Sequence, residues 1–109
     1  EMSPSPFART VHSWMYARAG RRAEALEILN EVLNYTPEKR VEACHSIAGT
    51  YIALGDHDRA IEWLATGVKA GTVDWFALVA SPWFDALRPD PRFSELVRDA
   101  ALKENRKRG

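Results

Sequence analysis

The chain has 109 residues, of which 46% are hydrophobic and 28% are charged, which is typical of a folded domain and excludes a disordered chain. Fifteen basic residues balance fifteen acidic ones, so neither nucleic acid nor an anionic membrane is expected as a partner. The sequence has no long apolar run and no leader, and its single cysteine cannot form an internal disulfide, so we expect a cytoplasmic location.

The first half of the chain predicts two helices, at about 7–19 and 22–35, after a linker or artificial chain end at residues 1–5. Ser5 precedes Pro6, which is the arrangement of an N-cap followed by a proline at the first helical position. An apolar stripe at helical spacing marks the second helix: Ala25, Ile28, Leu29, Val32 and Leu33.

Two further helices are predicted at about 38–54 and 57–70. Thr36 and Pro37 again pair an N-cap with a proline, and Asp56 is the N-cap that follows Gly55. Both helices carry an apolar stripe, made by Cys44, Ile47, Ala48, Tyr51 and Ile52 in the first and by Ala60, Trp63, Leu64, Gly67 and Val68 in the second.

An internal repeat links these two helix pairs. Tyr16, Gly20, Ala25, Leu26, Glu27 and Leu29 recur as Tyr51, Gly55, Ala60, Ile61, Glu62 and Leu64. The tyrosine is expected to pack a first helix against its neighbour, and the glycine to end that helix in a left-handed conformation. The alanine lets the second helix approach closely, and the leucine fills the space beneath it.

The C-terminal third predicts three shorter elements. Trp75, Phe76, Leu78 and Val79 form a short apolar helix, and Ser81 and Asp90 each stand before a proline as N-caps of the next two. The last helix has one apolar stripe, which would hide the end of the core: Phe93, Leu96, Val97, Ala100 and Ala101.

The repeated string resembles the tetratricopeptide repeat. The resemblance implies an all-α, right-handed α-α superhelix, with repeats at 6–39 and 40–71, a cap at 72–106 and a tail at 107–109. The opening helix departs from the pattern, because Arg9, His12 and Ser13 replace apolar or small packing residues. The stretch Asp85 to Phe93 is similar to the C-terminal ends of bacterial tetratricopeptide proteins, which often close serine/threonine kinases, adenylate-cyclase-like proteins or winged-helix regulators.

Reactive side chains do not form a recognisable active site. Cys44 and His45 are adjacent on a helix, so their side chains diverge, and His12 and His57 lack ligand spacing. No phosphate loop or nucleophile elbow occurs. We therefore expect no enzyme, no metal and no cofactor, and we expect Cys44 to be a buried, inert thiol.

The aromatic residues suggest a binding surface instead. We expect Trp63, Trp75 and Trp83 to be core residues. In the tetratricopeptide repeat the first helix of each pair lines a concave groove, which implies a groove formed by Phe7, Thr10, Trp14 and Arg18 of the first repeat and by Glu42, His45, Gly49 and Ala53 of the second. Trp14 and Arg18 would suit a peptide that carries an acidic group. The alternative for Trp14 is packing against a preceding repeat.

Two functional hypotheses follow. The first is a non-catalytic module that binds a protein or peptide in this groove. The second is a structural or sensory C-terminal domain of a larger bacterial signalling enzyme or transcription regulator. A homodimer that buries Phe7, Val11 and Trp14 is a further expectation.

Overall fold

The computed structural model of the chain describes the backbone of residues 6–108 and the side chains of residues 8–106. Within that span the chain is helical and contains no strand, which confirms the predicted all-α class. The linker and the Ser5 cap predicted at the start, the Phe7 side chain and the last tail residue lie outside the described part. The elements are α1 (Pro6–Arg18), α2 (Arg22–Leu33), α3 (Pro37–Glu42), α4 (Cys44–Ala53), α5 (His57–Ala70), α6 (Trp75–Ala80), the 3₁₀-helix η1 (Pro82–Leu87) and α7 (Pro91–Arg108).

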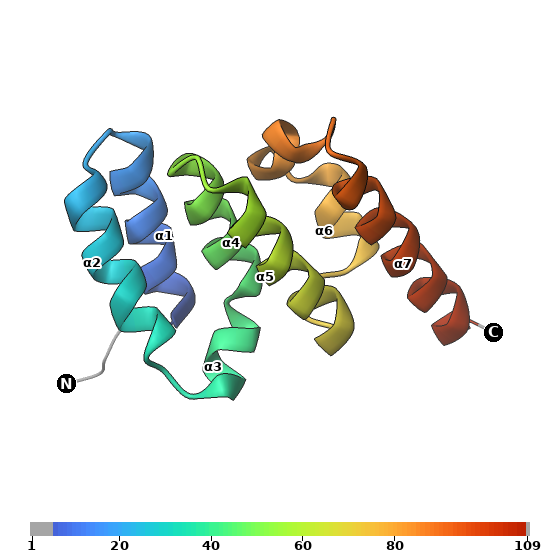
Figure 1. Cartoon of the computed structure of the whole chain (residues 1–109). Coiled ribbons are helices and arrows are strands. Elements are labelled where there is room, and N and C mark those ends of the chain that lie inside the picture. Colours follow the sequence, from blue (N-terminus) through green and yellow to red (C-terminus); the bar gives the residue numbers. More distant parts are fainter. Residues whose placement is uncertain (1–5, 109) are drawn as a thin grey trace.

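The helices form two layers. Figure 1 shows α2, α5 and α7 in the nearer layer and α1, α4 and α6 behind them, with successive pairs side by side along the chain. The described part is a flat, elongated body of 43 × 33 × 18 Å. None of its helices is both long and apolar enough to cross a membrane.

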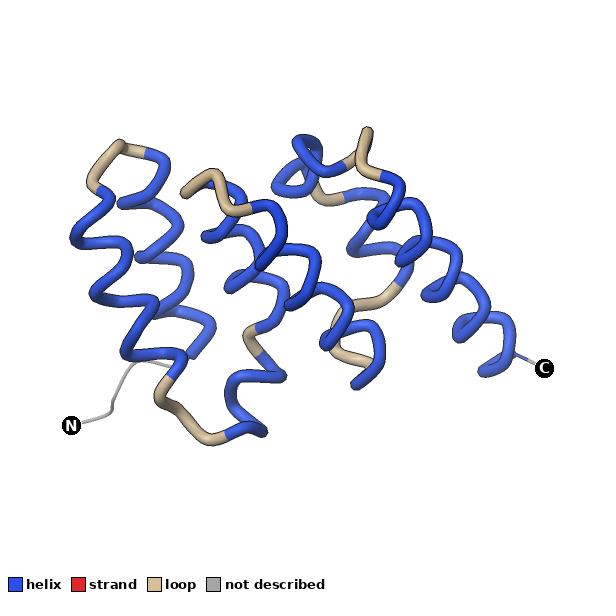
Figure 2. Tube along the Cα trace, in the orientation of Figure 1, coloured by secondary structure: helices blue, strands red, loops and turns tan. Residues whose placement is uncertain are grey.

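Short turns join the paired helices, as the repeat predicts (Figure 2). Gly20 and Gly55 have φ angles of 80° and 85°, so each ends a first helix in the left-handed region that favours glycine. The Asp56 side chain accepts a hydrogen bond of 3.1 Å from the backbone N–H of Arg59, and Thr36 caps α3 in the same way. These predicted helix ends are confirmed.

The single helix predicted at 38–54 is wrong, because the chain breaks at Ala43 between α3 and α4. No glycine or proline marks the break. Instead, polar side chains bind the backbone carbonyl groups around it: the Thr72 hydroxyl donates to the carbonyl of Val41 at 2.8 Å, and Ser46 donates to that of Ala43 at 3.2 Å. One donor from a distant segment, Thr72, and one from the first turn of α4, Ser46, therefore help to satisfy the backbone at the break.

The core lies between the two layers and continues into the cap. Most of the predicted apolar stripe positions are buried, and the largest fully buried side chains include Leu29, Val32, Ile47, Leu64, Leu78, Leu87, Phe84 and Phe93. Burial of such side chains is the main force that holds a helical repeat together. Tyr51 is buried in this core.

The cap joins the core through α7. Phe93, Leu96 and Ala100 are buried, as predicted, and Asp90 accepts a hydrogen bond of 2.9 Å from the N–H of Arg92. The Arg92 guanidinium also forms an ion pair of 2.9 Å with Asp58 at the start of α5. The last helix thus covers the end of the core, which a repeat fold requires.

The predicted burial of three tryptophans is wrong for one of them. Trp75 is 41% exposed, and its neighbour Phe76 is 67% exposed; both stand in the first turn of the short helix α6, of which only Leu78 is buried. Trp63 and Trp83 are half-buried and pack against the core. Aromatic side chains therefore lie at the surface as well as inside.

Candidate interaction groove

The candidate site is built on Gly49 in the middle of α4. The Trp83 ring from η1 lies on its backbone, because a β-carbon added at Gly49 would come within 2.3 Å of Trp83 Cε3. Real β-carbon atoms do not approach other carbons so closely. Only glycine at this position allows the indole to reach the helix.

Trp83 stacks against Trp14 of α1. The ring centroids are 4.4 Å apart and the planes differ by 16°. Stacked aromatic pairs of this kind contribute about 0.5–1.5 kcal/mol beyond the burial of their area. Trp14 therefore packs on Trp83 of the chain's own cap. This contact differs from the two that the sequence suggested, a ligand and a preceding repeat.

His45 is the third contact of the Trp83 ring. Its imidazole lies 5.4 Å from Trp83 and 4.8 Å from Phe84, centroid to centroid. Burial lowers the pKa of His45, an effect that the nearby carboxylate of Asp74 opposes. We call Trp14, His45 and Gly49 together the Trp83 seat.

An exposed arginine lies beside this seat. Arg18 is exposed, and its guanidinium carbon lies 5.6 Å from the centroid of the Trp14 ring, within cation–π range. Glu42 is exposed at the C-terminal end of α3. Arg18 thus places an accessible cation beside the aromatic rings, and Glu42 places an accessible anion at the end of the separate helix α3.

Thr10 does not line an open groove, because it is fully buried. Its hydroxyl hydrogen-bonds to that of Ser46, and the Thr50 hydroxyl donates to its carbonyl at 3.3 Å. Ser13 is also fully buried and donates to the carbonyl of Ala25 at 2.6 Å. These polar contacts hold α1 against α4 and α2, so part of the unusual composition of the first helix has a structural role.

The thiol of Cys44 lies away from this surface, in the core. It is fully buried, and loss of solvation raises its pKa to about 11. A thiol with such a pKa is protonated near neutral pH and is a poor nucleophile. Within the part of the chain that the structure describes, no three His, Cys, Asp or Glu side chains come together as a metal site would require.

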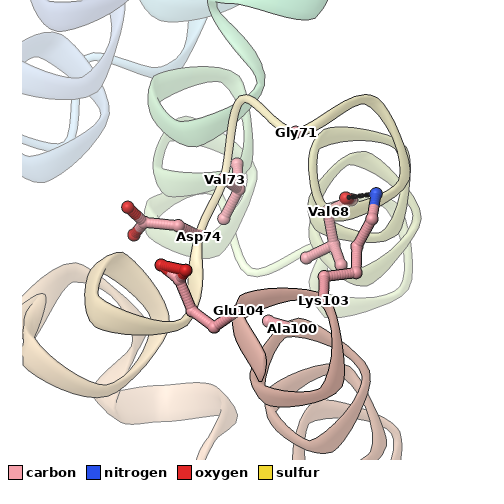
Figure 3. Close-up of a pocket in the computed structure, with 7 residues that line it drawn as sticks. All are labelled: Val68, Gly71, Val73, Asp74, Ala100, Lys103 and Glu104. Carbon is pink, nitrogen blue, oxygen red and sulfur yellow. Dashed lines mark hydrogen bonds between the residues drawn. The ribbon is translucent and has the colours of Figure 1, made fainter. Parts of the chain in front are cut away.

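A small cavity lies on another part of the molecule, between the end of α5 and α7 (Figure 3). Its volume is about 50 Å³, and it is lined by Val68, Gly71, Val73, Asp74, Ala100, Lys103 and Glu104. Lys103 Nζ donates to the carbonyls of Val68 and Lys69 at 2.8 and 2.7 Å. Known ligand pockets are larger, about 300 Å³ or more, so this cavity is a packing feature where α7 caps α5.

The repeated helix pairs agree with a comparison against known families. Residues 16–81 match the tetratricopeptide repeat, which is more than half of the chain. The chain belongs to the tetratricopeptide repeat family. Comparison with curated proteins and with solved structures gave no match.

The tetratricopeptide match covers the repeated helix pairs but not the two tryptophans that stack on each other. It begins at Tyr16 and ends at Ser81, so it covers both copies of the repeated string. Trp14 and Trp83 stand just outside its two ends. The seat therefore joins a tetratricopeptide helix, α4, to flanking segments beyond the match.

Sequence reasoning placed Trp14, His45 and Gly49 on the expected groove face but missed Trp83 as their partner, because it assigned Trp83 to the core. A glycine inside a predicted helix was the available signal, because it weakens the helix and often marks a close approach of another group. The sequence could not show which group approaches, since Trp83 comes from a separate element.

Proposed function

We propose that the chain is a non-catalytic module that binds a peptide or partner domain on the face formed by α1, α3 and α4. The tetratricopeptide repeat is generally a protein-protein interaction module, which supports this function. The paired helices also provide a rigid surface, since their contacts are buried and their turns are short. The face offers contacts for recognition and lacks an evident nucleophile.

The pairing of Trp14 with Arg18 carries the proposal. Trp14 is half-buried, so part of the indole faces solvent, and the Arg18 guanidinium is accessible beside it. Tryptophan and arginine are the side chains most enriched among residues that dominate binding energy at interfaces. An acidic group of the partner would pair with Arg18, because guanidinium and carboxylate groups form strong bidentate hydrogen bonds.

Glu42 and His45 extend the proposed surface. Glu42 is exposed, so it would favour a basic group of the partner, and His45 is half-buried beside the aromatic rings. Phe7, whose side chain the structure does not describe, is proposed at the far end of α1. Thr10 is left out because it is fully buried.

Selection from a displayed library of random peptides tests this proposal. Peptides that bind the immobilised chain should lose about 1–3 kcal/mol of binding energy with Arg18→Ala, and part of it with Glu42→Ala. Arg98→Ala is the matched control, because Arg98 is an exposed arginine on α7. Peptides that bind Arg18→Ala and Arg98→Ala equally well would contradict the proposed surface.

A second candidate is a structural or sensory C-terminal domain of a larger bacterial signalling enzyme or transcription regulator. The position of Trp83 favours it, because the cap already occupies part of the face that a ligand would use. This candidate predicts that the library yields no peptide dependent on Arg18 or Glu42. For either function we propose a cytoplasmic location, where a lone cysteine such as Cys44 stays reduced.

A homodimer through α1 remains a proposal for the same surface. Val11 is half-buried and Trp14 is partly covered by Trp83, whereas Met15 on the same helix is 56% exposed, so α1 offers some apolar area to a second copy. A stable protein interface usually buries about 800 Å² on each partner. Light scattering that shows a monomer at high concentration would exclude the homodimer.

A further inference from the structure

The side chain of Trp83 is held differently from those that follow it in η1. Phe84 and Leu87 are fully buried in the core, whereas Trp83 is only half-buried. The aromatic ring of Trp83 therefore lies at the surface of a segment that is firmly anchored below it. Rotation about its side-chain bonds would take the ring off the seat without removing η1 from the core.

Backbone contacts keep the segment in place during such a rotation. The Arg88 guanidinium donates hydrogen bonds to the carbonyls of Leu78, Val79 and Ser81, at 3.3, 3.2 and 3.0 Å. The Ser81 hydroxyl accepts a hydrogen bond from the N–H of Trp83 at 3.3 Å. Neither set of contacts uses the indole.

The seat itself does not depend on Trp83. The spacing between α1 and α4 is fixed by the buried hydroxyl contacts of Thr10 with Ser46 and Thr50. His45 also packs against Phe84, which is part of the core. When the Trp83 ring leaves, Gly49 presents bare backbone beside an aromatic ring and an imidazole. Such a surface fits a flat aromatic side chain.

We infer that the Trp83 seat is a recognition site for an aromatic side chain of a peptide partner, and that Trp83 occupies it until the partner displaces it. This inference rests on the proposed function, since it concerns the same face. Arg18 lies one helical turn beyond Trp14, about 5–6 Å along the helix surface. The ligand class is therefore a peptide with an aromatic residue and a carboxylate within a residue or two of it.

Internal occupancy has a measurable consequence. A ligand that must displace Trp83 binds more weakly than it would bind to an empty seat. Its apparent Kd is the Kd for the empty seat divided by the fraction of molecules in which the seat is free. Removal of the Trp83 ring should therefore strengthen binding of an aromatic carboxylate. The same substitution would weaken binding if Trp83 were itself a contact for the ligand.

The probe is N-acetyl-L-tryptophan, and binding is measured by calorimetry on the whole chain. Trp83→Ala should bind it about tenfold more tightly than the natural chain. Trp75→Ala is the matched control, because it removes an exposed tryptophan of the same cap and should leave the affinity unchanged. Gly49→Leu added to Trp83→Ala fills the seat and should abolish the gain.

The carboxylate contact is tested with the uncharged N-acetyl-L-tryptophanamide. Arg18→Ala in the Trp83→Ala background should weaken the acid about tenfold and the amide little. If Trp83→Ala does not fold, Trp83→Leu serves in its place, because leucine keeps part of the apolar volume but cannot stack. A folded variant that binds no better than the natural chain would overturn the inference.

Two results separate this inference from the proposed function. Library peptides that depend on Arg18 and bind Trp83→Ala no better than the natural chain would overturn the aromatic seat and leave the proposed face intact. Tighter binding of N-acetyl-L-tryptophan by Trp83→Ala, reversed by Gly49→Leu, would support the seat even when the library yields no Arg18-dependent peptide.

Discussion

Trp83 lies directly on Gly49, with Cε3 and Cζ3 of the indole 2.3 and 2.9 Å from the place where a β-carbon would stand. The two residues come from different elements, α4 and η1, and each permits the other: the glycine leaves room, and the indole covers the bare backbone. This contact joins the repeats to the cap on the face proposed for binding.

Gly49→Ala should therefore destabilise the chain despite the better helix propensity of alanine. The new methyl group collides with the Trp83 ring, and overpacking of this kind costs about 1–3 kcal/mol. In a Trp83→Ala background the collision is absent, so the same change should stabilise α4 by up to about 1 kcal/mol. Urea denaturation measures both free energies of unfolding.

Gly67→Ala is the control for this reversal of sign. A β-carbon at Gly67 would come within 2.4 Å of Val73 Cγ2, so it would collide with a residue other than Trp83. The nearest atoms belong to Val73 and Cys44, so the cost should be the same with and without the Trp83 ring. An equal cost of Gly49→Ala in the two backgrounds would show that Trp83 does not lie on Gly49.

Helix ends were predictable from the sequence where the signal is local. Thr36, Asp56 and Ser81 cap the helices that follow them, because a short polar side chain reaches N–H groups two or three residues ahead. Gly20 and Gly55 end helices because glycine, which lacks a side chain, adopts the positive φ angle that the turn requires.

Features that depend on distant residues were not predictable in this way. The break at Ala43 depends partly on Thr72, and the exposure of Trp75 depends on what α6 packs against. Periodicity in a window assigns residues to a helical face but does not say what covers it. The contact of Trp83 with this face was missed for the same reason, although Trp14, His45 and Gly49 were expected to share one face.

The burial of His45 should make the folded chain less stable in mild acid. Burial lowers its pKa, so the unfolded chain binds a proton at a higher pH than the folded chain does. The free energy of unfolding should fall as the pH drops below about 6.5, the ordinary pKa of histidine. His45→Gln should lessen this fall relative to His12→Gln, a change at an exposed histidine of α1. Equal slopes for the two variants would contradict the burial of His45.

The buried thiol of Cys44 should react slowly with disulfide reagents in the folded chain. Its pKa of about 11 and its full burial leave little accessible thiolate. A disulfide reagent such as DTNB at about pH 8 should label the folded chain at least about a hundredfold more slowly than the chain in urea, because the native chain must first open. Labelling at equal rates would place Cys44 at the surface.

The contacts of Arg88 should contribute strongly to the stability of the cap. Arg88→Ala removes three hydrogen bonds to carbonyls and the ion pair with Asp85. We expect a loss of about 1–3 kcal/mol in the free energy of unfolding, since donors on a charged group are among the stronger ones. Arg98→Ala on the exposed face of α7 should stay within about 0.5 kcal/mol. A loss no larger than that of Arg98→Ala would show that these contacts do not hold the cap.

The indole N–H signals of the four tryptophans provide the most direct measurement of where a partner binds. Single Trp→Phe variants assign the signals in a ¹⁵N-labelled chain, and a library-selected peptide is then added. Binding on the proposed face should shift the signals of Trp14 and Trp83 and leave those of Trp63 and Trp75 in place. Shifts of Trp63 or Trp75, with Trp14 and Trp83 unchanged, would contradict the account.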